Sequence, residues 1–189
     1  MRSNGRSRSA LRFLLPATLL WMGVIFWFSA RNAADSSIMS SGLLHALLKI
    51  CVPHWEQRSF AEQEAIHEAL HTLFRKCGHF SEFAVLGILL LQTLRHIPKL
   101  NPIRRQKHPA AGFFALSALL ALLYACSDEF HQRFVPGRSC ELRDVCIDFA
   151  GACCGMLICM LCGRLLRRIR QHRQASSAEN DGINPITQT

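Results

Sequence analysis

The sequence predicts an all-α polytopic membrane protein built as a bundle of four transmembrane helices. Four apolar stretches of 18 to 20 residues stand out, at 13–30, 77–95, 110–128 and 144–163. A helix needs about 17 to 25 residues to cross the hydrocarbon layer, so each stretch is long enough to span once. The stretches show no strand-like alternation, and a helix satisfies its backbone polar groups internally. These observations exclude a soluble globular domain and a disordered chain.

The distribution of basic residues predicts the orientation of the bundle. The chain has 189 residues and a net charge of +9. Segments 1–12, 95–109 and 164–189 lie on one side, and they carry 14 of the 22 Lys and Arg residues. The positive-inside rule therefore predicts that both termini are cytoplasmic. A nucleic-acid protein would gather its basic groups on one soluble face, so we expect no nucleic-acid partner.

The first apolar stretch has two interpretations, a retained helix and a cleaved signal peptide. Several arginines in residues 1–12 form a basic start, and Ser29 and Ala30 are small residues near the end of the stretch. However, the stretch exceeds the 7 to 15 apolar residues that are typical of a signal peptide. Trp21 and Trp27 also suit a retained helix. We therefore expect a retained first span.

Segment 31–76 is predicted to be an extracytoplasmic loop that contains an amphipathic helix. Ser59 and Glu62 have the spacing of a capping box, and apolar residues then recur at helical spacing from Ile66 onward. Residues 43–52 are apolar but too short to span, so we expect them to be interfacial or re-entrant. Beyond the fourth span, residues 167–189 are predicted to be a basic, disordered cytoplasmic tail.

Two motifs could bind metal, and for both we favour another interpretation. His67, Glu68 and His71 match HExxH, in which two histidines on one helix face bind zinc. No third ligand is marked by spacing, and the motif falls on the polar face of the predicted amphipathic helix, so a solvated face is favoured. Cys159 and Cys162 form a CxxC without a second pair. We expect no cofactor.

Most of the nine cysteines lie in or beside membrane helices, where cysteine behaves as a small apolar residue. A disulfide among Cys51, Cys77 and Cys140 is left open.

The main candidate site consists of polar residues at the outer ends of the second, third and fourth helices. Ionisable groups at membrane depth are costly, so they mark a functional site by default. The set comprises Lys76, His79, Glu82, Asp128, Glu129, Gln132, Arg138, Asp144 and Asp148. On the fourth helix, Gly151 and Gly155 form a GxxxG motif that allows another helix to approach closely.

Three blocks in this region resemble the VanZ-like family of membrane proteins. Residues 76–83 read KCGHFSEF, residues 127–138 read SDEFHQRFVPGR, and residues 144–155 read DVCIDFAGACCG. Their order, spacing and helix context agree with the family, and the DExHQxFxPGR block is highly specific. Two positions depart from the commonest pattern, because Phe83 stands where Tyr is usual and Asp148 where Asn is frequent.

The resemblance implies a bacterial plasma-membrane protein with a role at the cell envelope. The protein that gives the family its name lowers susceptibility to the glycopeptide antibiotic teicoplanin. We therefore expect the polar cluster to bind an amphiphile at the outer leaflet, such as a lipid-linked wall precursor or a lipoglycopeptide.

Alternatives from two other classes remain. One is a membrane-embedded enzyme, either a carboxylate acid–base hydrolase or transferase, with Asp128 and His79 as the pair, or a zinc protease on His67 and His71. The other is an ion-pair network that only holds the helices together. We favour binding over catalysis.

Overall fold

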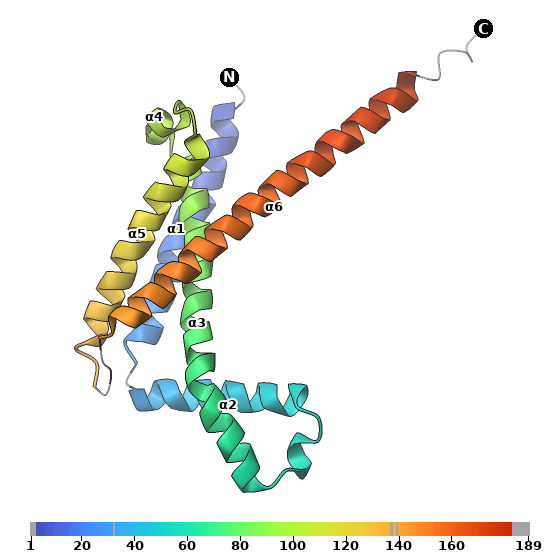
Figure 1. The fold of residues 1–189 in the computed structure, drawn as a ribbon. Helices are drawn as coiled ribbons and strands as arrows, with labels where there is room; N and C mark the ends of the chain where they lie inside the picture. Colours follow the sequence, from blue (N-terminus) through green and yellow to red (C-terminus); the bar gives the residue numbers. More distant parts are fainter. Residues whose placement is uncertain (1–2, 32, 137, 139, 183–189) are drawn as a thin grey trace.

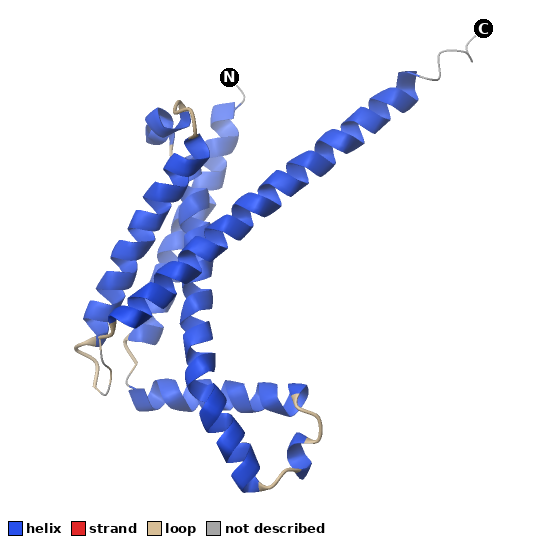
Figure 2. Ribbon diagram, viewed as in Figure 1, coloured by secondary structure: helices blue, strands red, loops and turns tan. Residues whose placement is uncertain are grey.

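The computed structural model describes residues 3–31, 33–136, 138 and 140–182, with side chains described at 9–31, 38, 40–100, 102–136, 138 and 140–174. The described residues form helices and no strand (Figure 2). The elements are α1 (Ser3–Ser29), α2 (Ala33–Cys51), η1 (Trp55–Gln57), α3 (Phe60–His96), η2 (Pro98–Leu100), α4 (Asn101–Arg104), α5 (Pro109–Gln132) and α6 (Leu142–Gly182). Four of them, α1, α3, α5 and α6, are long and apolar enough to cross a membrane, which confirms the predicted fold class.

The spanning helices alternate in direction, so both termini lie at one end of the bundle (Figure 1). We call this the terminal end; it also holds η2 and α4. The opposite end, which we call the α2 end, holds α2 and the connection from α5 to α6. Figure 1 shows α2 running across the direction of α1, α3 and α5. Its apolar part, Ser40–Cys51, is too short to span, as the sequence predicts.

The most extensive helix contact is a close crossing of α3 and α6. A Cβ added to Gly151 would meet the carbonyl oxygen of Phe80, and one added to Gly155 would meet that of Ala84. In the other direction, a Cβ on Gly87 of α3 would meet the carbonyl oxygen of Ala152. The partner of the GxxxG face is therefore α3. This crossing fixes the starts of both spans beside each other at the α2 end.

Polar side chains at several levels attach α1 to α3 and α5. Trp21 Nε1 donates to the carbonyl oxygen of Glu82 at 2.9 Å, and Tyr124 Oη donates to that of Met22 at 2.6 Å. The hydroxyls of Thr18 and Thr93 lie 2.8 Å apart. In an apolar environment a buried donor needs a partner, so these bonds set the depth of α1 against its neighbours.

The loop helix differs from the prediction, because the amphipathic segment and the second span are one continuous helix, α3. The predicted capping box is confirmed at its start: Ser59 Oγ accepts from the Glu62 amide, and Glu62 Oε2 accepts from the Ser59 amide at 3.0 Å. Leu44 and Leu48 of α2 pack with Trp55 against Ile66 and other apolar residues of α3. The apolar stripe of this part of α3 thus packs on α2 and Trp55.

The chain ends also differ from the prediction. Helix α1 begins at Ser3, inside the segment that we expected to precede the first span. Helix α6 continues to Gly182, so residues 167–182, which we expected to be disordered, are helical. Arg, Leu, Gln and Ala favour helix, and no Gly or Pro interrupts residues 164–181. Residues 183–189 of the predicted tail and Gly137 of the sequence motif lie outside the described residues.

Candidate functional site

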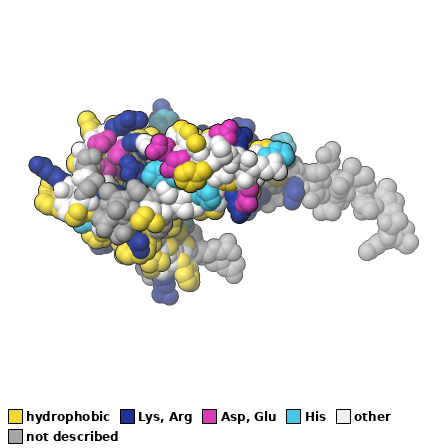
Figure 3. All heavy atoms as spheres, turned by 90° about the horizontal axis from the view of Figure 1, so that it is seen from below, with side chains coloured by type: hydrophobic (Ala, Val, Ile, Leu, Met, Phe, Trp, Pro, Cys, Tyr) yellow, Lys and Arg dark blue, Asp and Glu magenta, His cyan; other side chains and the backbone are white. Residues whose placement is uncertain are grey.

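The predicted polar residues meet at the α2 end of the bundle. They come from the start of the span in α3, the end of α5, the connection that follows α5 and the start of α6. Figure 3, which views the molecule from this end, shows acidic, basic and histidine side chains gathered on it. The bundle topology therefore collects residues from four separate places in the sequence.

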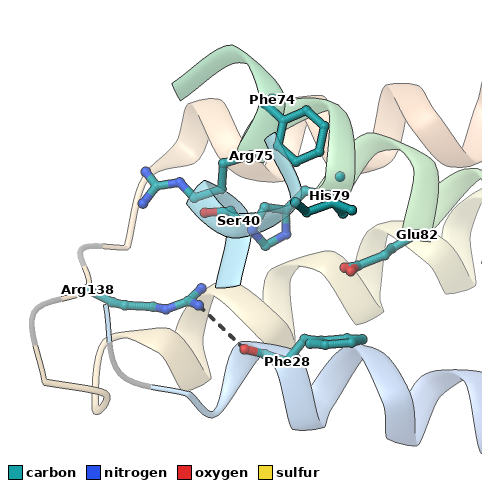
Figure 4. Close-up of a pocket in the computed structure, with 9 residues that line it drawn as sticks. Phe28, Ser40, Phe74, Arg75, His79, Glu82 and Arg138 are labelled. Atoms are coloured by element: carbon teal, nitrogen blue, oxygen red, sulfur yellow. Dashed lines mark hydrogen bonds between the residues drawn. The ribbon is translucent and has the colours of Figure 1, made fainter. Parts of the chain in front are cut away.

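A cavity of about 260 Å³ opens at this end between α1, α2, α3 and the connection from α5 to α6. Its polar lining includes Arg75, His79, Glu82 and Arg138. Its apolar lining comes from Phe28, Leu43 and Phe74. Figure 4 shows the Arg138 guanidinium, the His79 ring and the Glu82 carboxyl directed toward the same space. The cavity thus combines cationic, anionic and apolar groups.

Arg138 is held in place by three hydrogen bonds. Its Nε donates to the carbonyl oxygen of Arg31 at 3.1 Å, its Nη2 to that of Phe28 at 3.4 Å, and its Nη1 to Gln132 Oε1 at 3.2 Å. The Phe28 carbonyl lies in the last turn of α1, and the Arg31 carbonyl lies just beyond the end of the helix. Arg138 therefore caps α1 and presents its guanidinium to the cavity.

Asp128 and Gln132 support Arg138 through a chain of hydrogen bonds. Gln132 Nε2 donates to Asp128 Oδ2 at 3.0 Å, and this bond orients the Gln132 oxygen toward Arg138. Burial lowers the pKa of the Arg138 guanidinium, and the nearby charge of Arg75 lowers it further. The carboxyls of Asp128, Glu129 and Glu82 act in the opposite direction. An arginine remains charged at neutral pH, so the cavity keeps a fixed cation.

Two further carboxyl groups join helices to each other. Glu129 Oε2 accepts from the Glu141 amide at 3.1 Å, immediately before α6 begins. Lys76 of α3 forms an ion pair with Asp144 in the first turn of α6. Both contacts hold the start of α6 against its neighbours. None of the residues that make them lines the cavity.

Asp148 is the exception among the acidic residues. It is 1% exposed, and neither of its carboxylate oxygens has a hydrogen-bond partner among the described residues. Asp128, Glu129, Asp144 and Glu82 lie within electrostatic reach of it. Asp128, Glu129 and Asp148 do not line the described cavity. The nine predicted residues therefore lie at one end of the bundle. Some of them line the cavity, and the others lie in the network of contacts around it.

The HExxH histidines belong to the contact between α2 and α3. His71 Nε2 lies 2.8 Å from Ser40 Oγ, and His67 Nε2 lies 3.3 Å from the carbonyl oxygen of Ser41. The two rings stack with their centroids 5.7 Å apart. No third His, Cys, Asp or Glu joins them in a metal-binding geometry among the described residues. The predicted solvated face therefore holds only in part: Glu68 is exposed, whereas the two histidines are half-buried against α2.

The cysteines described by the structure are free thiols, including the exposed Cys51, Cys77 and Cys140. Cys159 Sγ accepts a hydrogen bond from Gln92 at 3.1 Å, so one member of the CxxC contributes to the α3–α6 contact.

Sequence reasoning missed several residues that line the cavity. Arg75 lies four residues before His79, and this helical spacing places both on one face of α3, so the periodicity could have identified it. Ser40, Leu43 and Phe28 have no such pattern. They reach the site only because α2 folds back across the bundle and α1 ends there.

Comparison with known proteins decides the family. The model of the VanZ/LLP1 family matches residues 14–163, which is most of the chain. The chain belongs to the VanZ/LLP1 family. The VanZ/LLP1 match extends well beyond the 76–155 region that carries the resemblance in sequence, and it includes α2 and every residue of the candidate site. No curated protein and no solved structure matches the chain.

Proposed function

We propose that this VanZ/LLP1 protein acts at the cell envelope by binding an anionic amphiphile at the outer leaflet. The observation that carries the proposal is the cavity at the α2 end, where Arg138 is fixed beside His79, Glu82 and an apolar wall. The ligand class comprises lipid-linked wall precursors and lipoglycopeptides such as teicoplanin. Binding of this kind supports a role in lowering susceptibility to glycopeptide antibiotics.

The proposed orientation places the α2 end outside. The terminal end carries the larger share of Lys and Arg, and such segments remain in the cytoplasm. The exposed apolar residues Leu43, Leu47 and Ile50 on α2 suit a helix that lies at the membrane surface beside the cavity. An amphiphile in the outer leaflet then reaches the cavity from the side.

The lining chemistry matches the two parts of such a ligand. A guanidinium offers a planar pair of donors to a phosphate or carboxylate. The Glu82 carboxyl and the His79 imidazole can bond sugar hydroxyls or an amine. Phe28, Leu43 and Phe74 offer an apolar surface to a lipid or acyl chain. We infer that Arg138 provides the main anchor.

Binding to the full-length protein in lipid nanodiscs tests this proposal. The probes are teicoplanin and an undecaprenyl-pyrophosphate-linked wall precursor, each titrated separately. We expect the wild type to bind at least one probe and Arg138→Lys to weaken that binding about tenfold, because the planar donor pair is lost while the charge remains. Arg133→Lys is the matched control, since Arg133 is exposed and does not line the cavity.

Two results would contradict the proposal. One is that neither probe binds the wild type. The other is that Arg138→Lys binds as tightly as Arg133→Lys.

Acid–base catalysis is a second candidate function, because an imidazole and a carboxyl group line the same cavity. The acid–base pair is then His79 with Glu82. Asp128, which the sequence suggested for this role, does not line the cavity and is linked to Arg138 through Gln132. Turnover of a bound lipid-linked precursor by the wild type, lost in Glu82→Gln with binding retained, would support this candidate. Intact precursor after prolonged incubation with the wild type would oppose it.

A further inference from the structure

A second charged cavity lies at the terminal end of the bundle. There α6 diverges from α3 and α5 (Figure 1), and a cavity of about 310 Å³ occupies the space between the three helices. Four arginines line it: Arg95 of α3 and Arg164, Arg167 and Arg170 of α6. The last three lie beyond the residues that the family match covers.

These four arginines have no acidic partner among the described side chains. The ion pairs of the described residues, Lys49 with Glu56 and Lys76 with Asp144, both lie at the α2 end. Arg95 and Arg167 are close enough for their charges to repel. Arg167 Nη2 lies 3.9 Å from where a Cβ on Gly163 would be, so the guanidinium lies close to this turn of α6. Like charges gathered around a cavity favour an anion inside it.

An apolar cavity adjoins the arginine cavity. It measures about 470 Å³, shares Ala110, Met160 and Arg164 with the first, and is walled by Phe114 and Leu157. From Cys77 to Arg95, α3 rises about 27 Å at 1.5 Å per residue, close to the thickness of the hydrocarbon layer. The arginines therefore lie at the level of lipid headgroups, with the apolar cavity beside them.

We propose that the terminal end binds the phosphate headgroup of an anionic membrane phospholipid. The four arginines hold the phosphate, and one acyl chain lies along Phe114, Met160 and Leu157. This site is separate from the cavity at the α2 end and does not depend on the function proposed for it. A free phosphate shares the headgroup chemistry, but it would leave the apolar cavity without an occupant.

Native mass spectrometry of the full-length protein in detergent tests the proposal with three probes: phosphatidylglycerol, phosphatidylcholine and inorganic phosphate. We expect the wild type to bind phosphatidylglycerol about tenfold more tightly than phosphatidylcholine. The double variant Arg164→Gln with Arg167→Gln should lose about tenfold in affinity for phosphatidylglycerol. Arg168→Gln with Arg173→Gln removes the same charge from the same helix outside both cavities, and it should bind like the wild type.

Folding does not confound this comparison, because Arg164 and Arg167 are exposed and the double variant Arg164→Lys with Arg167→Lys keeps their charge. The lysine variant should retain part of the affinity. Equal binding of the two phospholipids would overturn the proposal, as would equal losses in the two glutamine variants. Displacement of phosphatidylglycerol by inorganic phosphate at equal concentration would assign the site to free phosphate and overturn the lipid assignment.

Discussion

The acidic residues at the α2 end differ in what balances them. Asp144 has the Lys76 ammonium, Glu129 has a backbone amide, and Asp128 has the Gln132 amide. Asp148 has no described partner, although it is as deeply buried as Asp128 and Glu129. A buried carboxyl without a partner lowers the free energy of unfolding, so its removal can stabilise the protein. Removal of a paired carboxyl destabilises the protein, because its partner is left unpaired.

This difference predicts opposite effects for two equivalent substitutions. Asp148→Asn should raise the free energy of unfolding by about 1 kcal/mol, because it removes an ionisable carboxyl that has no described partner and lies near four other carboxyls. Asp144→Asn should lower it by about 1 to 3 kcal/mol, since the partly buried Lys76 loses its partner. Thermal unfolding of both variants in the same detergent measures the contrast. Destabilisation by Asp148→Asn equal to that by Asp144→Asn would show that Asp148 is paired.

Residue identity and spacing predicted which groups lie together at the α2 end but not what each one contacts. The helical spacings of Lys76, His79 and Glu82, and of Asp128 and Gln132, placed them together at one end. The partners of Arg138 are the carbonyl groups of Phe28 and Arg31. Every residue carries a carbonyl, so no sequence pattern marks these two. The division between cavity lining and support therefore required the structure.

At the scale of the elements, the close approach of α3 and α6 depends on glycine. Gly155→Ala should lower the free energy of unfolding by about 1 to 3 kcal/mol, because the added Cβ meets the backbone of Ala84 and forces the helices apart. Gly23→Ala is the matched control, since it also lies within a spanning helix but has open space around it. Denaturant titration should show a loss only for Gly155→Ala. Equal tolerance of both changes would contradict the crossing.

The contact between α2 and α3 gives a separate prediction about metal. His71→Ala should lower the free energy of unfolding by about 1 kcal/mol, because the hydrogen bond to Ser40 is lost. A strong chelator should leave the melting temperature of the wild type unchanged, since the histidines contact α2. A chelator-induced fall in melting temperature that zinc reverses would instead favour the zinc interpretation of HExxH.

The elements themselves were partly predictable. Mean hydropathy over a span is a local property of the chain, so the four spans could be identified from sequence, and the capping box marked the start of α3. The continuity of α3 through residue 76 could not be predicted from sequence, because it depends on Leu44, Leu48 and Trp55 packing on the first turns of α3. The helical tail was missed because its polar composition outweighed its helix propensity in our prediction.

For the whole molecule, the even number of spans places the two termini together, and charge predicts which side they occupy. Cys140 lies in the exposed connection at the α2 end, and Arg105 lies in the exposed connection at the terminal end. In a chain that keeps only Cys140, a membrane-impermeant maleimide should label intact cells. In a cysteine-free chain with Arg105→Cys, it should label only permeabilised cells. The reverse pattern would place the α2 end in the cytoplasm and contradict the proposed orientation.

We propose that the cavity at the α2 end carries the function of this VanZ/LLP1 protein. The most direct measurement is teicoplanin susceptibility of a sensitive Gram-positive host that expresses the chain, with membrane protein levels matched by immunoblot. The wild type and Arg133→Lys should protect the host, whereas Arg138→Lys and Asp128→Asn should lose protection, because each disrupts the network that holds the cavity's cation. No protection by well-expressed wild type, or full protection by Arg138→Lys, would contradict the account.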